Sequence, residues 1–177
     1  LLLVFALTGI YLAKQLPGLL RYAWMPLVII LLYIFGTPGS DKTTTGMIYE
    51  GESSYNYIQV LQDGEFTLLR LNEGQGVHSI YSPDTLNYNG PWEQVLSAPF
   101  FNAAPVPPNT ITSAAIVGLA AGTTSHALFS VFPAIQIDGI EIDPLIVDIG
   151  RQYFAMDNEN LNVIIQDGRW ALEKSER

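Results

Sequence analysis

Three stretches in the second half of the chain decide its fold: SAAIVGLAAGTTSHALFSVF (residues 113–132), IQIDGIEIDP (residues 135–144) and LNVIIQDG (residues 161–168). Each begins with a short apolar run and reaches a glycine or an acid where that run ends. A helical pattern follows each run, and this alternation of strand and helix predicts βαβ units around a parallel sheet. The predicted fold class is therefore α/β, with helices covering the sheet.

The turn after the first run is built from small residues. Gly118, Ala120 and Gly122 lie between a strand and a helix, where small side chains let a ligand approach the backbone and the first amides of the helix. This pattern predicts a nucleotide-binding loop, but any strand-to-helix turn favours glycine, so the motif alone has low specificity.

Two acids end the other two predicted strands. Glu141 follows Gly122 by 19 residues, a spacing at which an acid can accept hydrogen bonds from ribose hydroxyls, although it could also be a solvated acid. Asp167, followed by Gly168, can accept the exocyclic amine of adenine or cap the next helix, and Asp143 is predicted to cap the helix that begins after it. Because parallel strands end at one edge of a sheet, these residues together predict a crevice there.

A different pattern precedes this α/β unit. Residues 47–82 read as a small antiparallel sheet of three strands, in which Asp63-Gly64 predicts a hairpin and the segment MIYEG is a lead-in. A helix is predicted from Pro91 to Ala98, because proline suits the first helical position. The proline-rich segment 102–110 marks the boundary to the βαβ region.

The first 36 residues are apolar. Residues 19–36 read LLRYAWMPLVIILLYIFG, with Arg21 as the one charge, and about 20 apolar residues suffice for a transmembrane helix. Residues 1–12 read as the end of an earlier membrane helix, with a short turn between the two. Since the chain opens with Leu rather than Met, we expect it to be a fragment of a longer protein.

Composition excludes several classes of protein. With 49% hydrophobic and 14% charged residues, the chain is not disordered, and without cysteine it has no disulfide scaffold or thiolate metal site. No metal is predicted. The net charge of −9 argues against nucleic-acid binding. All 17 acids but only 6 basic residues follow Gly36, so this part carries a net charge of −11.

The quoted stretches resemble a known family. VGLAAGT, DGIEIDP and QDGRWAL are similar to the spermidine synthase (polyamine aminopropyltransferase) family, which has a class I methyltransferase-like fold. The segments ESSYNYIQV, RLNEGQGVHSIYSPD and GPWEQVLSAPFF resemble its small β domain, a later hairpin and its gatekeeping helix. The resemblance covers residues 47–172, and the apolar head is similar to a bacterial subgroup in which this domain is fused to membrane helices.

The predicted domain organisation follows from these patterns together. It comprises transmembrane helices over residues 1–36, a linker over 37–46, a small antiparallel β domain with a gatekeeping helix over 47–101, and the N-terminal part of a Rossmann-like nucleoside-binding domain over 102–177.

The resemblance also implies roles for individual residues. The implied cofactor-binding residues are Asn56, Gly118, Ala120, Gly122, Glu141, Asp167 and Gly168. In the family the glycine-rich loop lines the nucleoside, the acid after the second strand holds the ribose, and the Asp-Gly pair contacts adenine. Candidates for the substrate pocket are Tyr55, His78 and Trp92, although core packing is the simpler role for Tyr55 and Trp92.

The chain departs from the family pattern at two positions. Ala121 stands where the family's loop carries an aspartate that helps to hold the aminopropyl amine, and Trp92-Glu93 replaces the Tyr-His pair of the gatekeeping helix. The family's catalytic aspartate, which orients and deprotonates the attacking amine, follows the fourth strand. The catalytic residue is therefore unknown and is expected after residue 177.

The resemblance implies a membrane-anchored transferase that moves an aminopropyl group from decarboxylated S-adenosylmethionine to putrescine or a related amine. One alternative is a methyltransferase-like enzyme that uses intact S-adenosylmethionine, which Ala121 slightly favours. Another is a non-catalytic, membrane-tethered ligand-binding domain, since a fold does not fix a function. An NAD-binding domain is disfavoured by Asp167-Gly168 and by the preceding β domain.

The expected location is the cell membrane, with several spans and the lipid bilayer as a partner. Because the decarboxylated cofactor is made in the cytosol, we expect the soluble domain to be cytoplasmic. The distribution of Lys14 and Arg21 predicts the opposite orientation by the positive-inside rule, but it rests on two charges only. The resemblance further implies self-association into a homo-oligomer.

Overall fold

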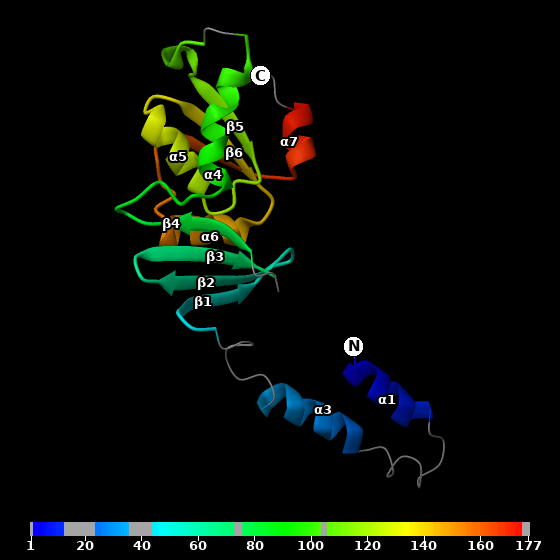
Figure 1. Cartoon of the computed structure of the whole chain (residues 1–177). Coiled ribbons are helices and arrows are strands. Elements are labelled where there is room, and N and C mark those ends of the chain that lie inside the picture. Colours follow the sequence, from blue (N-terminus) through cyan, green and yellow to red (C-terminus); the bar gives the residue numbers. More distant parts are fainter. Residues whose placement is uncertain (1, 13–23, 36–43, 73–75, 104–105, 175–177) are drawn as a thin grey trace. The chain divides into compact units, whose positions relative to one another are not determined.

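The structure is a computed structural model that describes residues 2–12, 24–35, 44–72, 76–103 and 106–174 (Figure 1). The chain divides into two compact units, Leu1–Thr43 and Thr44–Arg177. Both β-sheets lie in the second unit.

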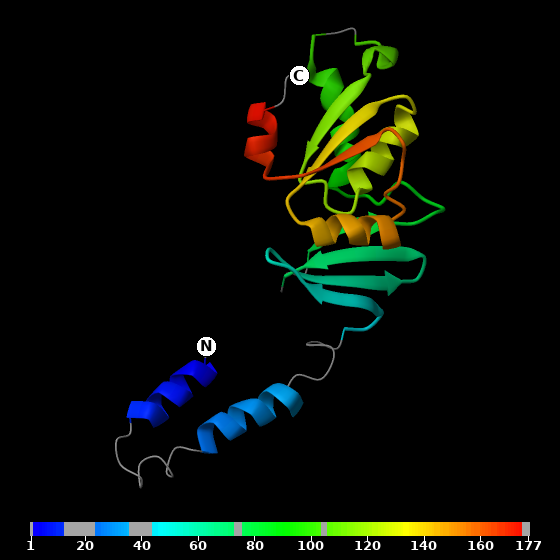
Figure 2. The ribbon, with the colours of Figure 1, turned by 180° about the vertical axis from the view of Figure 1, so that it is seen from behind.

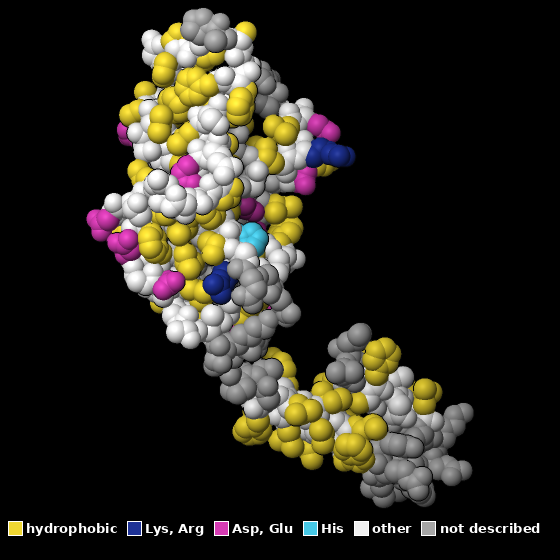
Figure 3. Space-filling view, viewed as in Figure 1, with side chains coloured by type: hydrophobic (Ala, Val, Ile, Leu, Met, Phe, Trp, Pro, Cys, Tyr) yellow, Lys and Arg dark blue, Asp and Glu magenta, His cyan; other side chains and the backbone are white. Residues whose placement is uncertain are grey.

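The described residues of the first unit form two apolar helices, α1 (Leu2–Leu12) and α3 (Trp24–Phe35). No residue of α3 is buried, and Figure 3 shows hydrophobic side chains over it. Phe5, Tyr33 and Phe35 are among the large apolar side chains exposed on these helices. Within the described segments, no helix has both the length and the apolar character needed to cross a bilayer.

The predicted membrane span over residues 19–36 overlaps α3 only in part. Helix α3 contains 12 residues, whereas residues 19–23 and 36 lie outside the described residues, as do Lys14 and Arg21. The predicted linker over 37–46 is described only from residue 44. The predictions of transmembrane helices and of their orientation therefore stay predictions.

The first sheet is antiparallel, as predicted, but has one strand more than expected. Its strands are β1 (Met47–Glu52), β2 (Tyr57–Asp63), β3 (Phe66–Leu71) and β4 (Val77–Tyr81), in the order β1-β2-β3-β4. The hairpin at Asp63-Gly64 is confirmed, because Asp63 pairs with Phe66 and Gly64 has a φ of +59°. The segment MIYEG is not a lead-in but forms β1, which pairs along β2.

The predicted helix from Pro91 to Ala98 is only partly correct. Helix α4 (Pro91–Gln94) is a single α-helical turn, and a 3₁₀-helix, η1 (Val95–Phe101), continues from it. Proline begins α4 as expected. Pro99 lies inside η1 and lacks the N–H that a regular α-helical hydrogen bond needs there.

The second sheet is parallel, and this prediction is confirmed. Its strands are β5 (Ser113–Val117), β6 (Gln136–Glu141) and β7 (Leu161–Ile165), in the order β5-β6-β7. The helices α5 (Thr123–Val131), α6 (Pro144–Tyr153) and α7 (Gly168–Lys174) alternate with them, and a short 3₁₀-helix, η2 (Pro108–Thr110), precedes β5. In register, Val117 pairs with Ile140 and Glu141 with Ile165, so the three strands end at one edge.

Helix α6 lies between the two sheets (Figures 1 and 2). On one side, Ile146 and Ile149 join a buried cluster with Ile58 and Leu69 of the antiparallel sheet. On another side of the helix, Val147 packs in a second cluster with Leu119, Met156 and Val163, which lie in or near the parallel sheet. Burial of α6 against both sheets joins them into a single unit, because removing this apolar surface from water stabilises both contacts together.

The outer edge of β4 forms hydrogen bonds with the turn after β5 and with the first residue of α5. The hydroxyl of Thr123 donates to the Ile80 carbonyl oxygen and accepts from the Ile80 amide, both at 2.8 Å. The Ser79 hydroxyl oxygen accepts from the Ala121 amide at 3.0 Å. Hydrogen bonds from β4 of the antiparallel sheet therefore hold the turn after β5 in place.

Candidate functional site

The turn between β5 and α5 is compact because three of its residues have a left-handed backbone. The φ angles are +82° at Gly118, +50° at Ala120 and +91° at Gly122. The amides of Gly118 and Leu119 both donate to the Ile140 carbonyl oxygen at 2.9 Å, so the turn folds over the end of β6. A Cβ atom added at Gly118 would meet no heavy atom within 4 Å. This side of the turn is open to a ligand.

Gly122 has a packing role in addition to its backbone role. A Cβ atom there would lie 2.8 Å from Cγ of Met156, and a φ of +91° strains any L side chain.

We expect Gly122→Ala to lower the free energy of unfolding by about 1–3 kcal/mol, measured by urea denaturation. Gly64→Ala is the matched control, because Gly64 also has a positive φ but open space around it. Equal losses in both variants would show that the Met156 contact contributes nothing.

Glu141 joins the ends of β5 and β6. Its side chain is 8% exposed at the last position of β6. Oε2 accepts from the Ala120 amide at 2.9 Å, and Oε1 accepts from the amides of Ile142 and Asp143 at 2.9 and 3.1 Å. A carboxylate can accept about four hydrogen bonds, so one further donor, such as a sugar hydroxyl, can bind without breaking these contacts.

The turn after β7 lies at the same edge. Asp167 is exposed, and its Oδ1 accepts from the Trp170 amide at 3.1 Å, so it caps the first turn of α7. A Cβ atom on Gly168 would lie 2.5 Å from Cγ1 of Val117, so a larger residue at this position would require the Val117 side chain to move. The capping role of Asp167 is confirmed, and its contact with adenine stays a prediction.

Exposed apolar side chains surround these polar groups. Val117 ends β5 and is 53% exposed, Ile165 ends β7 and is 51% exposed, and Ile142, directly after β6, is 37% exposed. Ligand sites in proteins combine apolar walls with a few fixed polar groups. A carboxylate beside three exposed apolar side chains suits a ligand with a hydroxylated sugar and a flat, weakly polar base.

Asn56 reaches this edge but is occupied by protein contacts. Its Nδ2 donates to Oδ2 of Asp143 at 2.9 Å, and its Oδ1 accepts from Nδ2 of Asn72 at 3.1 Å. Tyr55, next to it, is exposed, so the core-packing role expected for it is wrong. The predicted helix cap at Asp143 is confirmed, since Oδ1 accepts from the Leu145 amide at 3.1 Å. Direct ligand binding by Asn56 stays a prediction.

Ala121 does not face the open side of the turn. It is fully buried in the cluster that contains Ile146, Ile149 and Phe154. The sequence identified this position only as a departure from the family pattern. Its burial, and the contact of its amide with Ser79, carry no signal in the sequence, because the partners come from elements far along the chain.

The other two candidates for the substrate pocket lie in separate environments. His78 is exposed on β4, at a bulge where the pairing with β3 shifts between Leu69 and Arg70. The Trp92 ring packs edge-on against Tyr88, with ring centroids 6.4 Å apart. Packing is therefore the role that the structure gives Trp92, and substrate contacts of both residues stay predictions.

Glu93 stabilises the start of α4 through its carboxylate. It accepts from the amides of Tyr88 at 2.5 Å and Gly90 at 3.0 Å. Burial raises the pKa of Glu93, but hydrogen bonds from the backbone amides of Tyr88, Glu93 and Gly90 outweigh it, so the pKa lies below its ordinary value. The tyrosine at position 88 is the reverse case, because burial raises its pKa and keeps the phenol protonated.

The lowered pKa of Glu93 predicts a pH dependence of this turn. A carboxyl group with a depressed pKa stabilises the fold above its unfolded pKa and loses that contribution as the pH falls through the folded pKa. We expect the turn to loosen below the ordinary value of about 4.5, seen as a change in Trp92 fluorescence. Glu93→Gln should remove this transition, and an unchanged transition in that variant would assign it to another group.

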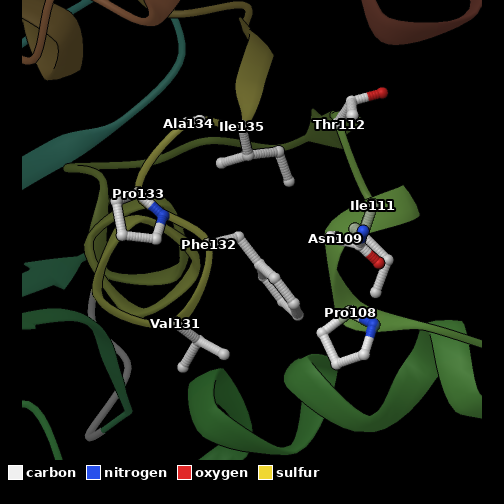
Figure 4. Close-up of a pocket in the computed structure, with 9 residues that line it drawn as sticks. All are labelled: Pro108, Asn109, Ile111, Thr112, Val131, Phe132, Pro133, Ala134 and Ile135. Atoms are coloured by element: carbon white, nitrogen blue, oxygen red, sulfur yellow. The ribbon is translucent and has the colours of Figure 1, made fainter.

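Two hollows adjoin the parallel sheet. One, of about 450 Å³, runs along β5 to Gly118 and is bounded by η1 and α5. The other, of about 290 Å³, lies at the opposite edge, where Ile111 and Ile135 precede their strands; Figure 4 shows the Phe132 ring among its lining residues. Among the described residues, neither lining contains an acid or a base, whereas Glu141 lies at the carboxyl edge of the sheet.

Comparisons with known proteins identify relatives of the chain in sequence and in fold. No family model matches the chain. A probable polyamine aminopropyl transferase of Bifidobacterium longum is 34% identical over 125 residues, which cover 71% of this chain and 26% of that protein. A polyamine aminopropyltransferase of Vibrio vulnificus is 26% identical over 160 residues, which cover 85% of this chain and 50% of that protein. The chain thus spans a quarter to a half of these relatives.

Solved structures share the fold of the chain. A probable spermidine synthase from Corynebacterium glutamicum superposes with a TM-score of 0.58 at 16% identity, covering 75% of this chain and 48% of that one. A spermidine synthase in complex with the transition-state analogue AdoDATO gives a TM-score of 0.55 at 18% identity, covering 72% and 43%. The chain is therefore similar in sequence to polyamine aminopropyltransferases, which are transferases, and it shares its fold with spermidine synthases.

Proposed function

We propose that the chain provides the nucleoside-binding part of an aminopropyltransferase that uses decarboxylated S-adenosylmethionine. The observation that carries this proposal is the position of Glu141, whose carboxylate lies at the end of β6, bonded to the β5 turn and flanked by exposed apolar side chains. The carboxylate would accept a hydrogen bond from a ribose hydroxyl, and the apolar side chains would contact the base. The names of the relatives support the same ligand class.

The proposed reaction is a nucleophilic substitution at carbon. The nitrogen of putrescine or a related amine attacks the aminopropyl carbon that is bonded to the sulfonium. A C–N bond forms, the C–S bond breaks with its electron pair moving to sulfur, and methylthioadenosine leaves. The proton released from the new ammonium passes to a general base. We assign no such base among the described residues, whose part is to bind and orient the nucleoside.

A second candidate function is methyl transfer from intact S-adenosylmethionine. It is favoured by Ala121, which is buried and apolar where the family resemblance implies a carboxylate for the amine. Without that carboxylate, a positively charged aminopropyl amine has one partner fewer. The two functions share the nucleoside and differ in the group bonded to sulfur, so a comparison of the two ligands separates them.

The test combines binding with product analysis on the full-length protein. Calorimetry with decarboxylated and intact S-adenosylmethionine measures both affinities, and mass spectrometry after incubation with putrescine detects spermidine and methylthioadenosine. Tighter binding of the decarboxylated form together with both products supports aminopropyl transfer. Preference for the intact form supports methyl transfer. Binding of both forms with equal affinity and without product indicates a ligand-binding domain, and no binding contradicts the proposal.

We also propose that the apolar helices anchor the protein in a membrane, with the second unit on the cytoplasmic side. The exposed apolar side chains of α1 and α3 support this, because such surface is costly in water. We expect the protein to resist extraction from membranes by alkaline carbonate. We also expect a fluorescent reporter at its C-terminus to be active in the cytoplasm. Release by carbonate, or an active periplasmic phosphatase at the same position, would contradict this proposal.

A further inference from the structure

The second unit contains a buried carboxylate to which the proposed function assigns no part. Asp143 is fully buried, and one of its oxygens, Oδ1, accepts from the Leu145 amide at the start of α6. A helix cap needs only this one hydrogen bond, so the second carboxylate oxygen is not required for capping. Burying a charged group is costly unless the group is fully hydrogen-bonded, and the second oxygen, Oδ2, obtains its partners from a distant part of the chain.

Those partners come from the loop between β1 and β2. The Ser53 hydroxyl donates to Oδ2 of Asp143 at 2.5 Å, and Nδ2 of Asn56 donates to the same oxygen at 2.9 Å. The Ser53 oxygen accepts from the amides of Tyr55 and Asn56, which directs its hydrogen away from them. Oδ1 of Asn56 accepts from Asn72, which fixes the orientation of the amide.

The backbone of Asp143 continues this network to the candidate site. Its amide donates to Oε1 of Glu141 at 3.1 Å, and Oε2 of Glu141 accepts from Ala120 in the β5 turn. Hydrogen bonds thus run from Asn72 through Asn56, Asp143 and Glu141 to Ala120. They connect the antiparallel sheet to the carboxylate at the end of β6 and to the turn that faces the ligand.

We infer that Asp143 is a positioning residue: by binding Ser53 and Asn56, it sets the orientation of the Glu141 carboxylate relative to the β5 turn. The antiparallel sheet then affects nucleoside affinity without contacting the nucleoside. The consequence for ligand affinity rests on the proposed function. The consequence for the hydrogen bond between Glu141 and Ala120 does not, and can be measured without a ligand.

The test uses an exchange of side chains across the contact. In Asp143→Asn, an amide donor can replace the oxygen that now accepts from Asn56, so two donors face each other. Adding Asn56→Asp restores one acceptor and one donor across the same distance and returns the lost negative charge. Thr67→Val is the control, because Thr67 is a buried hydroxyl of the antiparallel sheet whose partner is Gln62. Ser53→Ala is a milder variant should Asp143→Asn fail to fold.

Three quantities are measured on the full chain: the melting temperature, the hydrogen-exchange rate of the Ala120 amide, and the Kd of methylthioadenosine. We expect Asp143→Asn to raise the exchange rate and the Kd by about tenfold each, since hydrogen bonds to charged groups contribute strongly. The double variant should return both to within about threefold of the wild type. Thr67→Val should lower only the melting temperature.

The possible results separate the two proposals. If Asp143→Asn lowers the melting temperature but leaves Ala120 exchange and the Kd as in Thr67→Val, Asp143 is merely structural and the inference is wrong. Failure of Asn56→Asp to restore the exchange rate would also overturn it. If no variant binds methylthioadenosine but Ala120 exchange follows the expected pattern, the proposed function fails and the positioning role stands.

Discussion

Ala121→Asp is expected to destabilise the second unit strongly rather than to create an amine-binding site. Ala121 is 0% exposed and packs with Ile146, Ile149 and Phe154. A carboxylate at this position would lose its hydration without gaining a cationic partner. An uncompensated buried charge costs about 3–5 kcal/mol, a large part of the total stability of about 5–15 kcal/mol typical of a domain. Urea denaturation followed by circular dichroism measures the loss.

Ala134→Asp is the matched control for this experiment. Ala134 is exposed in the turn before β6, and exposed substitutions change stability by about 0.5 kcal/mol or less. The same added charge should therefore be tolerated there. A folded Ala121→Asp protein that binds decarboxylated S-adenosylmethionine more tightly than the wild type would show that position 121 faces the ligand, and our description of the turn would be wrong.

Glu141→Gln is expected to weaken nucleoside binding by about 10- to 100-fold. The substitution keeps the size of the side chain but replaces one acceptor oxygen by a donor, which then faces the backbone amides of Ala120 or of Ile142 and Asp143. The charge-assisted hydrogen bond to a ribose hydroxyl would be lost or weakened, and such a bond contributes about 1.5–3 kcal/mol. Calorimetry with methylthioadenosine measures the Kd.

Glu159→Gln provides the control for the change in charge. Glu159 is exposed before β7, so its loss alters the net charge equally without touching the site. We expect its Kd to equal that of the wild type. An unchanged Kd in Glu141→Gln would remove Glu141 from the site, and an equal loss in both variants would indicate a general electrostatic effect.

The main elements of the fold could be predicted because their signals are local. Asp63-Gly64 identifies a hairpin, and the alternation of apolar runs with helical segments identifies the parallel sheet. Strand β1 was missed because MIYEG contains a glutamate and a glycine, and its pairing along β2 decides its conformation. Helix α4 was predicted too long, because proline favours a helix start but does not determine where the helix ends.

The sequence predicted which residues lie at the site, but not the contacts that hold them there. The acid that ends β6 and the small residues after β5 do meet at one edge, as the parallel sheet requires. The burial of Ala121 and the contact between Asp143 and Ser53 could not be predicted. Both depend on how α6 packs against a sheet formed by residues about 80 positions earlier, and single-residue patterns contain no information on such contacts.

The most direct test of the nucleoside site is hydrogen exchange of the full chain with and without methylthioadenosine. Protection at residues 118–122 and 141–143, lost in Glu141→Gln, is the result we predict. Those segments line the open side of the β5 turn and the end of β6. Protection confined to residues 108–112 and 131–135, which line the cavity at the opposite edge, would contradict the account, as would the absence of any protection at saturating ligand.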